Sequence, residues 1–191
     1  MSQEIGKGHP AQEDPVATAD GLLPTGRTRV DEARRTQVIP AVATEAFEQA
    51  EARFIARDPG RHLDQGQRTL ARVLALSDRL AETGYRAPGT GVQSVLGLLA
   101  DAVGEAGGRA IGISPTATTV PWLSAALGGA PAHVLSEWCE SRTGTARLRP
   151  GDMLIVTDAH MVLSVWPDHV RDVIDEVEAA GAVIRLIGVP A

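Results

Sequence analysis

Apolar residues follow two different periods along the chain. Over residues 38–83 they recur every three or four positions, as with Phe47 and Phe54, and this spacing predicts helices. Pro59 and Gly60 interrupt the pattern, because both residues favour turns over helix interiors. We therefore expect a hairpin of two helices in this part of the chain.

From residue 84 onward, short apolar runs alternate with helical patterns. Residues 109–114, 152–158 and 182–189 are expected to be strands, and a weaker strand near residue 84 leads into a glycine-rich loop. Strands separated by helices indicate a parallel sheet with right-handed crossovers. The pattern predicts an α/β fold, a three-layer parallel-sheet sandwich preceded by an N-terminal helical hairpin.

The chain divides into three zones. Residues 1–36 are polar, rich in glycine, proline and charge, and without a period, which is typical of a disordered tail. Residues 37–83 form the expected hairpin, and residues 84–191 form the α/β domain. The hairpin carries more apolar residues than one short helical pair easily buries, so we expect it to form the interface of a homo-oligomer.

Composition narrows the class of protein. Aromatic residues make up only 3% of the chain, so the core must consist of aliphatic side chains, as in helices packed on a parallel sheet. The net charge of −6 argues against nucleic-acid binding. Cys139 is the only cysteine, which excludes an internal disulfide and favours a cytoplasmic location. No apolar run is long enough to cross a membrane.

Three polar segments follow expected strands, at residues 89–94, 114–119 and 157–160. In parallel sheets, ligands bind where strands end. Glycines permit close backbone approach, a helix N-terminus attracts anions, and hydroxyls donate hydrogen bonds. This predicts a pocket for a phosphorylated, polyhydroxylated ligand. The candidate binding residues are Gly89, Thr90, Gly91, Gln93, Ser94, Ser114, Thr116, Thr118, Thr119 and Thr157.

Plainer interpretations of the same residues stay open. Glycine and threonine also build turns and helix caps. The Gly-Thr-Gly run starting at Gly89 matches neither the P-loop motif nor the dinucleotide-binding motif. His160 is the best candidate for acid–base chemistry because histidine titrates near neutral pH. The histidines lack the spacing of metal ligands, so we expect no metal and no cofactor.

The order of these features resembles the sugar isomerase (SIS) phosphosugar-binding family, and most nearly the phosphoheptose isomerases. The resemblance rests on the segments "GRAIGISPTATTVPWLSAALGG" and "RPGDMLIVTD" and on the closing helix and strand. It implies that Asp101 or Glu105, on the helix after the first loop, supplies the catalytic carboxylate. The family's C-terminal histidine helix has no counterpart, which places isomerisation in question while leaving sugar-phosphate binding expected.

Two other resemblances are weaker. Residues 89–115 are similar to the LOG-type nucleotide phosphoribohydrolases, although that family's glycine-rich signature is absent. "GYRAPGTGVQS" is similar to serine recombinases, but Gly89 stands where the nucleophilic serine belongs. We therefore expect binding of a small phosphorylated metabolite. The alternatives are hydrolysis of nucleoside monophosphates and a catalytically inactive scaffold.

Overall fold

The computed structural model describes residues 42–57, 63–77, 81–84, 91–141 and 148–189. The expected tail at residues 1–36 lies outside these residues, as does the connection between the two expected hairpin helices. The elements in chain order are α2 (Thr44–Arg57), α3 (Gln65–Leu76), β1 (Ala81–Gly84), α4 (Val92–Glu105), β2 (Ala110–Ser114), α5 (Val120–Ala126), β3 (Ala132–Val134), α6 (Leu135–Glu140), β4 (Met153–Val156), α7 (Ala159–Val165), α8 (Pro167–Ala180) and β5 (Val183–Val189).

The described strands form one parallel sheet in the order β1-β5-β4-β2-β3. Strand β4 lies at the centre, and its Ile155 is in register with Gly112 of β2 and Arg185 of β5. All four residues of β4 are buried, as expected for a strand covered on both faces. The expected α/β fold with a parallel sheet is confirmed.

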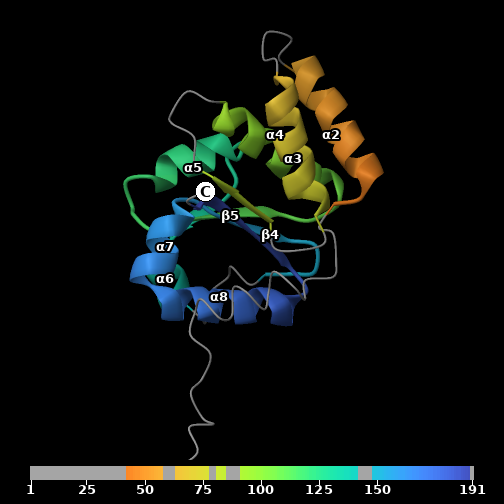
Figure 1. Ribbon diagram of the computed structural model, residues 1–191. Helices are drawn as coiled ribbons and strands as arrows, with labels where there is room; N and C mark the ends of the chain where they lie inside the picture. The colour runs from red at the N-terminus through yellow and green to blue at the C-terminus, as the bar shows by residue number, and fades with distance from the viewer. Residues whose placement is uncertain (1–41, 58–62, 78–80, 85–90, 142–147, 190–191) are drawn as a thin grey trace, which may run out of the picture.

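The helices cover the two faces of the sheet as separate layers, which Figure 1 shows above and below the strands. The chain moves in one direction across the sheet from β1 to β3 and then returns through β4 to β5. Right-handed crossovers place the helices of the outward and return paths on opposite faces. Accordingly, α4 and α5 share one apolar core with one side of the sheet, while α6, α7 and α8 share the other.

Helices α2 and α3 pack against α4 (Figure 1). Phe47 and Phe54 of α2 and Leu74 of α3 are buried in the same core as α4. Gly97 permits this close approach, because a Cβ atom there would lie 3.3 Å from the Phe54 ring. The apolar residues of α2 and α3 therefore cover α4 within the chain.

The structure differs from the sequence-based expectation in three places. Helix α3 ends at Leu76, and Ala81–Gly84 form β1, although residues 81–83 were expected to be helical and only residue 84 to begin a weak strand. Their strand conformation comes from pairing with β5 and not from intrinsic preference. The segment at residues 132–138, whose apolar pattern fits either a strand or a helix, contains both, since β3 runs directly into α6. Helix α7, which follows β4 almost at once, was not expected.

Candidate functional site

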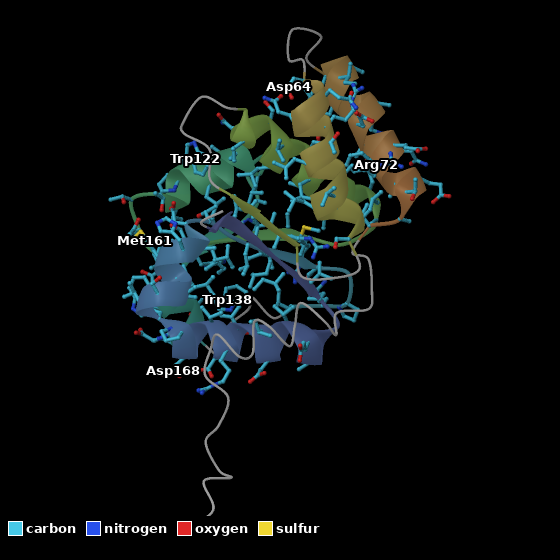
Figure 2. The ribbon with its side chains drawn as sticks, in the orientation of Figure 1. Asp64, Arg72, Trp122, Trp138, Met161 and Asp168 are labelled. Carbon is cyan, nitrogen blue, oxygen red and sulfur yellow. The ribbon has the colours of Figure 1, made fainter. Side chains whose placement is uncertain are left out.

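The three polar segments predicted from the sequence follow β1, β2 and β4. Because these strands are parallel, the described residues of the three segments, 91–94, 114–119 and 157–160, lie at the carboxyl-terminal edge of the sheet, where such folds bind ligands. Gly89 and Thr90 lie outside the described residues. Exposed Trp122 on α5 and Met161 on α7 flank the same edge (Figure 2).

The N-terminus of α4 lies at this edge of the sheet. Gly91 caps the helix in the left-handed region, with φ 77°. Its carbonyl oxygen accepts hydrogen bonds from the backbone N–H groups of Ser94 at 2.9 Å and Val95 at 3.1 Å. The earlier N–H groups of a first turn have no partner within the helix and carry its positive dipole end. Gln93 is exposed and Ser94 half-buried beside them, so the arrangement suits an anion.

Gln67 of α3 lies against this helix start, and sequence reasoning missed it. A Cβ atom on Gly91 would come 1.9 Å from the side-chain nitrogen of Gln67. A reciprocal capping box fixes Gln67, because the Asp64 backbone N–H donates to Gln67 Oε1 (3.0 Å) and the Gln67 N–H donates to Asp64 Oδ1 (2.8 Å). The run Asp64-Gln65-Gly66-Gln67 carries the signal for this box.

The hydroxyl groups after β2 lie close to one another. Ser114 is fully buried, and its Oγ is hydrogen-bonded to Thr119 Oγ1. Thr116 Oγ1 lies 3.1 Å from the hydroxyls of both Thr118 and Thr119, and Thr119 Oγ1 donates to the Thr116 carbonyl at 3.0 Å. These contacts satisfy the hydroxyls within one turn, which matches the plainer interpretation that they build the entry to α5.

The segment after β4 is tied to its neighbouring strands. Thr157 is buried, and its backbone N–H donates to the Ile113 carbonyl at 2.9 Å. Asp158 has a φ of 49°, a left-handed conformation that non-glycine residues adopt rarely. His160 Nδ1 lies 2.8 Å from the Gly188 carbonyl of β5. Since a carbonyl only accepts, Nδ1 is the donor in this contact.

The two carboxylates proposed as catalytic are not at this edge. Asp101 is nine positions after the first residue of α4, which places it about 14 Å along the helix axis. It forms an ion pair with Arg57 of α2 at 3.2 Å, and Glu105, one turn later, pairs with Arg53. Both carboxylates therefore hold α2 against α4, remote from the predicted pocket.

A cluster of charged groups around Asp152 lies at the opposite edge of the sheet. The Asp152 carboxylate accepts hydrogen bonds from the Arg109 backbone N–H and from the Arg149 N–H, each at 2.9 Å, and from the Arg109 guanidinium. Burial alone would raise the pKa of Asp152, but these bonds hold it below its ordinary value. This cluster fastens the start of β4 to the start of β2, which is a structural role.

A second buried charge supports α3. The Arg185 side chain of β5 is fully buried and donates to the carbonyl oxygens of Leu74 and, at 2.8 Å, of Ser77. Burial lowers the pKa of Arg185 to about 10. The carbonyl groups at the end of α3 thus receive a cation, which suits the negative end of a helix dipole.

A family model described as an AAA domain matches residues 62–191, well over half of the chain. A comparison with curated proteins gives no match. The described helices include none long and apolar enough to span a membrane.

This match overturns the family resemblances drawn from sequence. The sugar isomerase, LOG-type phosphoribohydrolase and serine recombinase resemblances are wrong, because the matched model belongs to a different superfamily, of the P-loop NTPase type. The three functions predicted from the sequence are therefore also wrong. They were sugar-phosphate binding, hydrolysis of nucleoside monophosphates and an inactive scaffold. The resemblance misled because a glycine loop and hydroxyl turns at the ends of parallel strands are shared by many α/β families.

The matched segment contains strand β1 and the start of helix α4. Strand β1 ends at Gly84 and α4 begins after its cap residue, Gly91, and in P-loop proteins a helix start that follows a strand binds phosphates. The sheet, the helix layers and this helix start all lie within residues 81–189. The chain therefore belongs to the AAA domain family.

Proposed function

We propose that this chain binds the phosphate groups of a nucleotide at the N-terminus of α4 and does not hydrolyse it. The observation that carries the proposal is the start of α4, capped by Gly91 in the left-handed region, within the segment that matches an AAA domain. Backbone N–H groups and the helix dipole supply the attraction for phosphate there.

The side chains at the site argue against hydrolysis. The P-loop motif ends in glycine, lysine and then serine or threonine, whereas Gly91 is followed by Val92 and Gln93. Lys7 is the only lysine of the chain and precedes the matched segment. Phosphoryl transfer depends on cations that stabilise the charge of the transition state. Without that lysine, binding is supported and catalysis is not.

Isothermal titration with ADP, ATP and ribose 5-phosphate tests the proposal. We expect both nucleotides to bind and ribose 5-phosphate to bind much more weakly, and we expect ATP to be recovered intact after incubation. Equal affinity for the sugar phosphate would contradict nucleotide binding. Release of phosphate from ATP at an enzymatic rate would contradict the absence of hydrolysis.

A single isosteric change locates the site. Gln93→Glu places a carboxylate in the exposed first turn of α4, where it favours the helix but repels phosphate. We expect nucleotide binding to be lost while the melting temperature stays the same or rises. Gln49→Glu makes the same atomic change on an exposed position of α2 and should leave binding intact. Equal binding by both variants would remove the α4 terminus from the site.

A further inference from the structure

We infer that nucleotide binding by this chain does not require a divalent cation. The inference rests on the proposed function and concerns the same site. It follows from a mismatch between the ligands that Mg²⁺ needs in P-loop proteins and the residues that this chain places there.

In P-loop enzymes, Mg²⁺ is held by the hydroxyl of the serine or threonine after the P-loop lysine and by an aspartate after a buried strand. The first position is Gln93 here, an exposed amide in place of a short hydroxyl. Its side chain is longer than serine and offers N–H donors, which suit a phosphate oxygen better than a cation.

The second position also lacks the expected ligand. The residue directly after β4 is Thr157, which is buried and whose Oγ1 lies 3.4 Å from the Ile113 carbonyl, within the sheet. The first carboxylate, Asp158, comes one residue later in a left-handed conformation. Among the residues that the structure describes, no group of three histidine, cysteine, aspartate or glutamate side chains is arranged to hold a metal ion.

Val92 is a third residue that differs from the Mg²⁺-binding P-loop pattern. An aliphatic side chain replaces the lysine that neutralises the phosphates, so the attraction comes from backbone dipoles. A Mg²⁺–nucleotide complex has fewer free phosphate charges to offer to such dipoles than the uncomplexed nucleotide does. The residues present therefore do not fit a bound Mg²⁺, and the nucleotide is expected to enter without one.

Titration of the full chain with ADP, once in excess MgCl₂ and once in EDTA, tests this inference. We expect the dissociation constant in EDTA to equal that in Mg²⁺ or to be lower. A dissociation constant lower by an order of magnitude in Mg²⁺ would overturn the inference while leaving the proposed function in place. Absence of ADP binding in both buffers would overturn the proposed function and this inference with it.

Two variants test whether the side chains at the start of α4 determine the effect of Mg²⁺ on ADP binding. The double substitution Val92→Lys and Gln93→Ser supplies the lysine and the hydroxyl that the P-loop motif carries after its second glycine, and we expect ADP to bind this variant more tightly in Mg²⁺ than in EDTA. Ser94→Ala removes the nearest native hydroxyl and should leave the Mg²⁺ response of the chain unchanged. A Mg²⁺ dependence in the native chain that disappears in Ser94→Ala would identify Ser94 as a cation ligand and overturn the inference.

Discussion

The side-chain amide of Gln67 lies so close to Gly91 that a methyl group on the glycine would come 1.9 Å from the amide nitrogen. The contact joins the starts of α3 and α4, and it makes glycine necessary at position 91 for two reasons. The backbone needs a φ of 77°, and the space for a side chain is already occupied.

Gly91→Ala should lower the free energy of unfolding by about 1–2 kcal/mol, the cost of a left-handed conformation for a residue with a Cβ atom, and by more if the Gln67 amide is displaced from its capping box. Urea denaturation of the single variants and of the Gly91→Ala, Gln67→Ala double variant measures the coupling. We expect Gly91→Ala to cost less in the Gln67→Ala background. Strictly additive effects would contradict the contact.

Gly181→Ala is the matched control for the cost of placing a residue with a Cβ atom in the left-handed region. Gly181 has a similar φ of 66°, and the nearest atom to an added Cβ lies 3.7 Å away. It should show the conformational cost alone. If the loss of stability in Gly181→Ala also changed in the Gln67→Ala background, the coupling measured at Gly91 would not come from its contact with Gln67.

Asp152→Asn should destabilise the fold by about 1–3 kcal/mol, because a buried oxygen that accepts N–H bonds is replaced by an NH₂ group. We expect a loss of stability smaller than that of a fully buried ion pair, because the Arg109 side chain is 39% exposed and water screens its charge. Asp168→Asn alters an exposed carboxylate of α8 and should change stability by less than about 0.5 kcal/mol. Thermal and urea denaturation measure both.

The same carboxylate makes stability depend on pH. The pKa of Asp152 is lowered in the folded state, so the unfolded chain binds the proton first as pH falls. Its contribution is fully present above the unfolded pKa of about 3.9 and is lost as pH falls through the folded value. The native chain should therefore lose more stability on acidification than Asp152→Asn does. Parallel acid profiles would contradict the assignment.

Phe54→Glu should unfold or severely destabilise the chain, by about 3–5 kcal/mol or more, because Phe54 is 5% exposed and packs on α4. Ile55→Glu is the control, since Ile55 is the next residue of the same helix and is 36% exposed. It should retain the melting temperature to within a few degrees. Circular dichroism compares the two, and a folded Phe54→Glu chain would contradict the packing.

The homo-oligomer expected from the sequence stays a prediction. Its argument was that a helical pair could not bury its apolar residues, whereas Phe47, Phe54 and Leu74 are buried against α4. Among the apolar residues of α2 and α3, Val73 and Ile55 are exposed and still favour an interface. Light scattering of the unmodified chain and of Val73→Glu tests it, and a monomeric unmodified chain would contradict it.

Arg185→Met should lower stability by about 1–3 kcal/mol, because the carbonyl groups of Leu74 and Ser77 lose their buried donor. Amide hydrogen exchange should accelerate at the end of α3 before it does in β4. Arg185→Lys should recover only part of the loss, since an ammonium group lacks the fork that reaches two carbonyls. Unchanged exchange at residues 73–77 would contradict the prediction.

Much of the fold follows from sequence period alone. The runs that became β2, β4 and β5 are apolar and short, and α8 repeats Val170, Val173, Ile174 and Val177 toward the sheet. Strand β1 was predicted only at its last residue, because residues 81–83 have no strand preference and form a strand through their pairing with β5. The edge that carries the candidate site was predicted from the parallel topology, since ligands gather where such strands end.

The individual site residues were predictable only in part. Gly91 and the hydroxyls after β2 follow strands, as the order of the apolar runs indicated, but the ligand class depends on features that many α/β families share. Gln67 comes from a helix that precedes the sheet, and nothing in local sequence says that α3 will meet the start of α4. Asp101 and Glu105 were misplaced because helical periodicity does not tell which end of a helix faces the strand ends.

Strand β5 is the last described strand in the chain but lies between β1 and β4. Strand β1 therefore has no neighbour in the sheet until residues 183–189 have been synthesised. On the ribosome, β1 cannot pair until the residues from α4 to β5 have been synthesised. Until then its backbone donors and acceptors face water. Closing a sheet in this way requires contacts between distant parts of the sequence, which slows folding. Synthesis and completion of the sheet are thus linked, and a nascent chain that stalls before β5 would expose strand edges that promote aggregation.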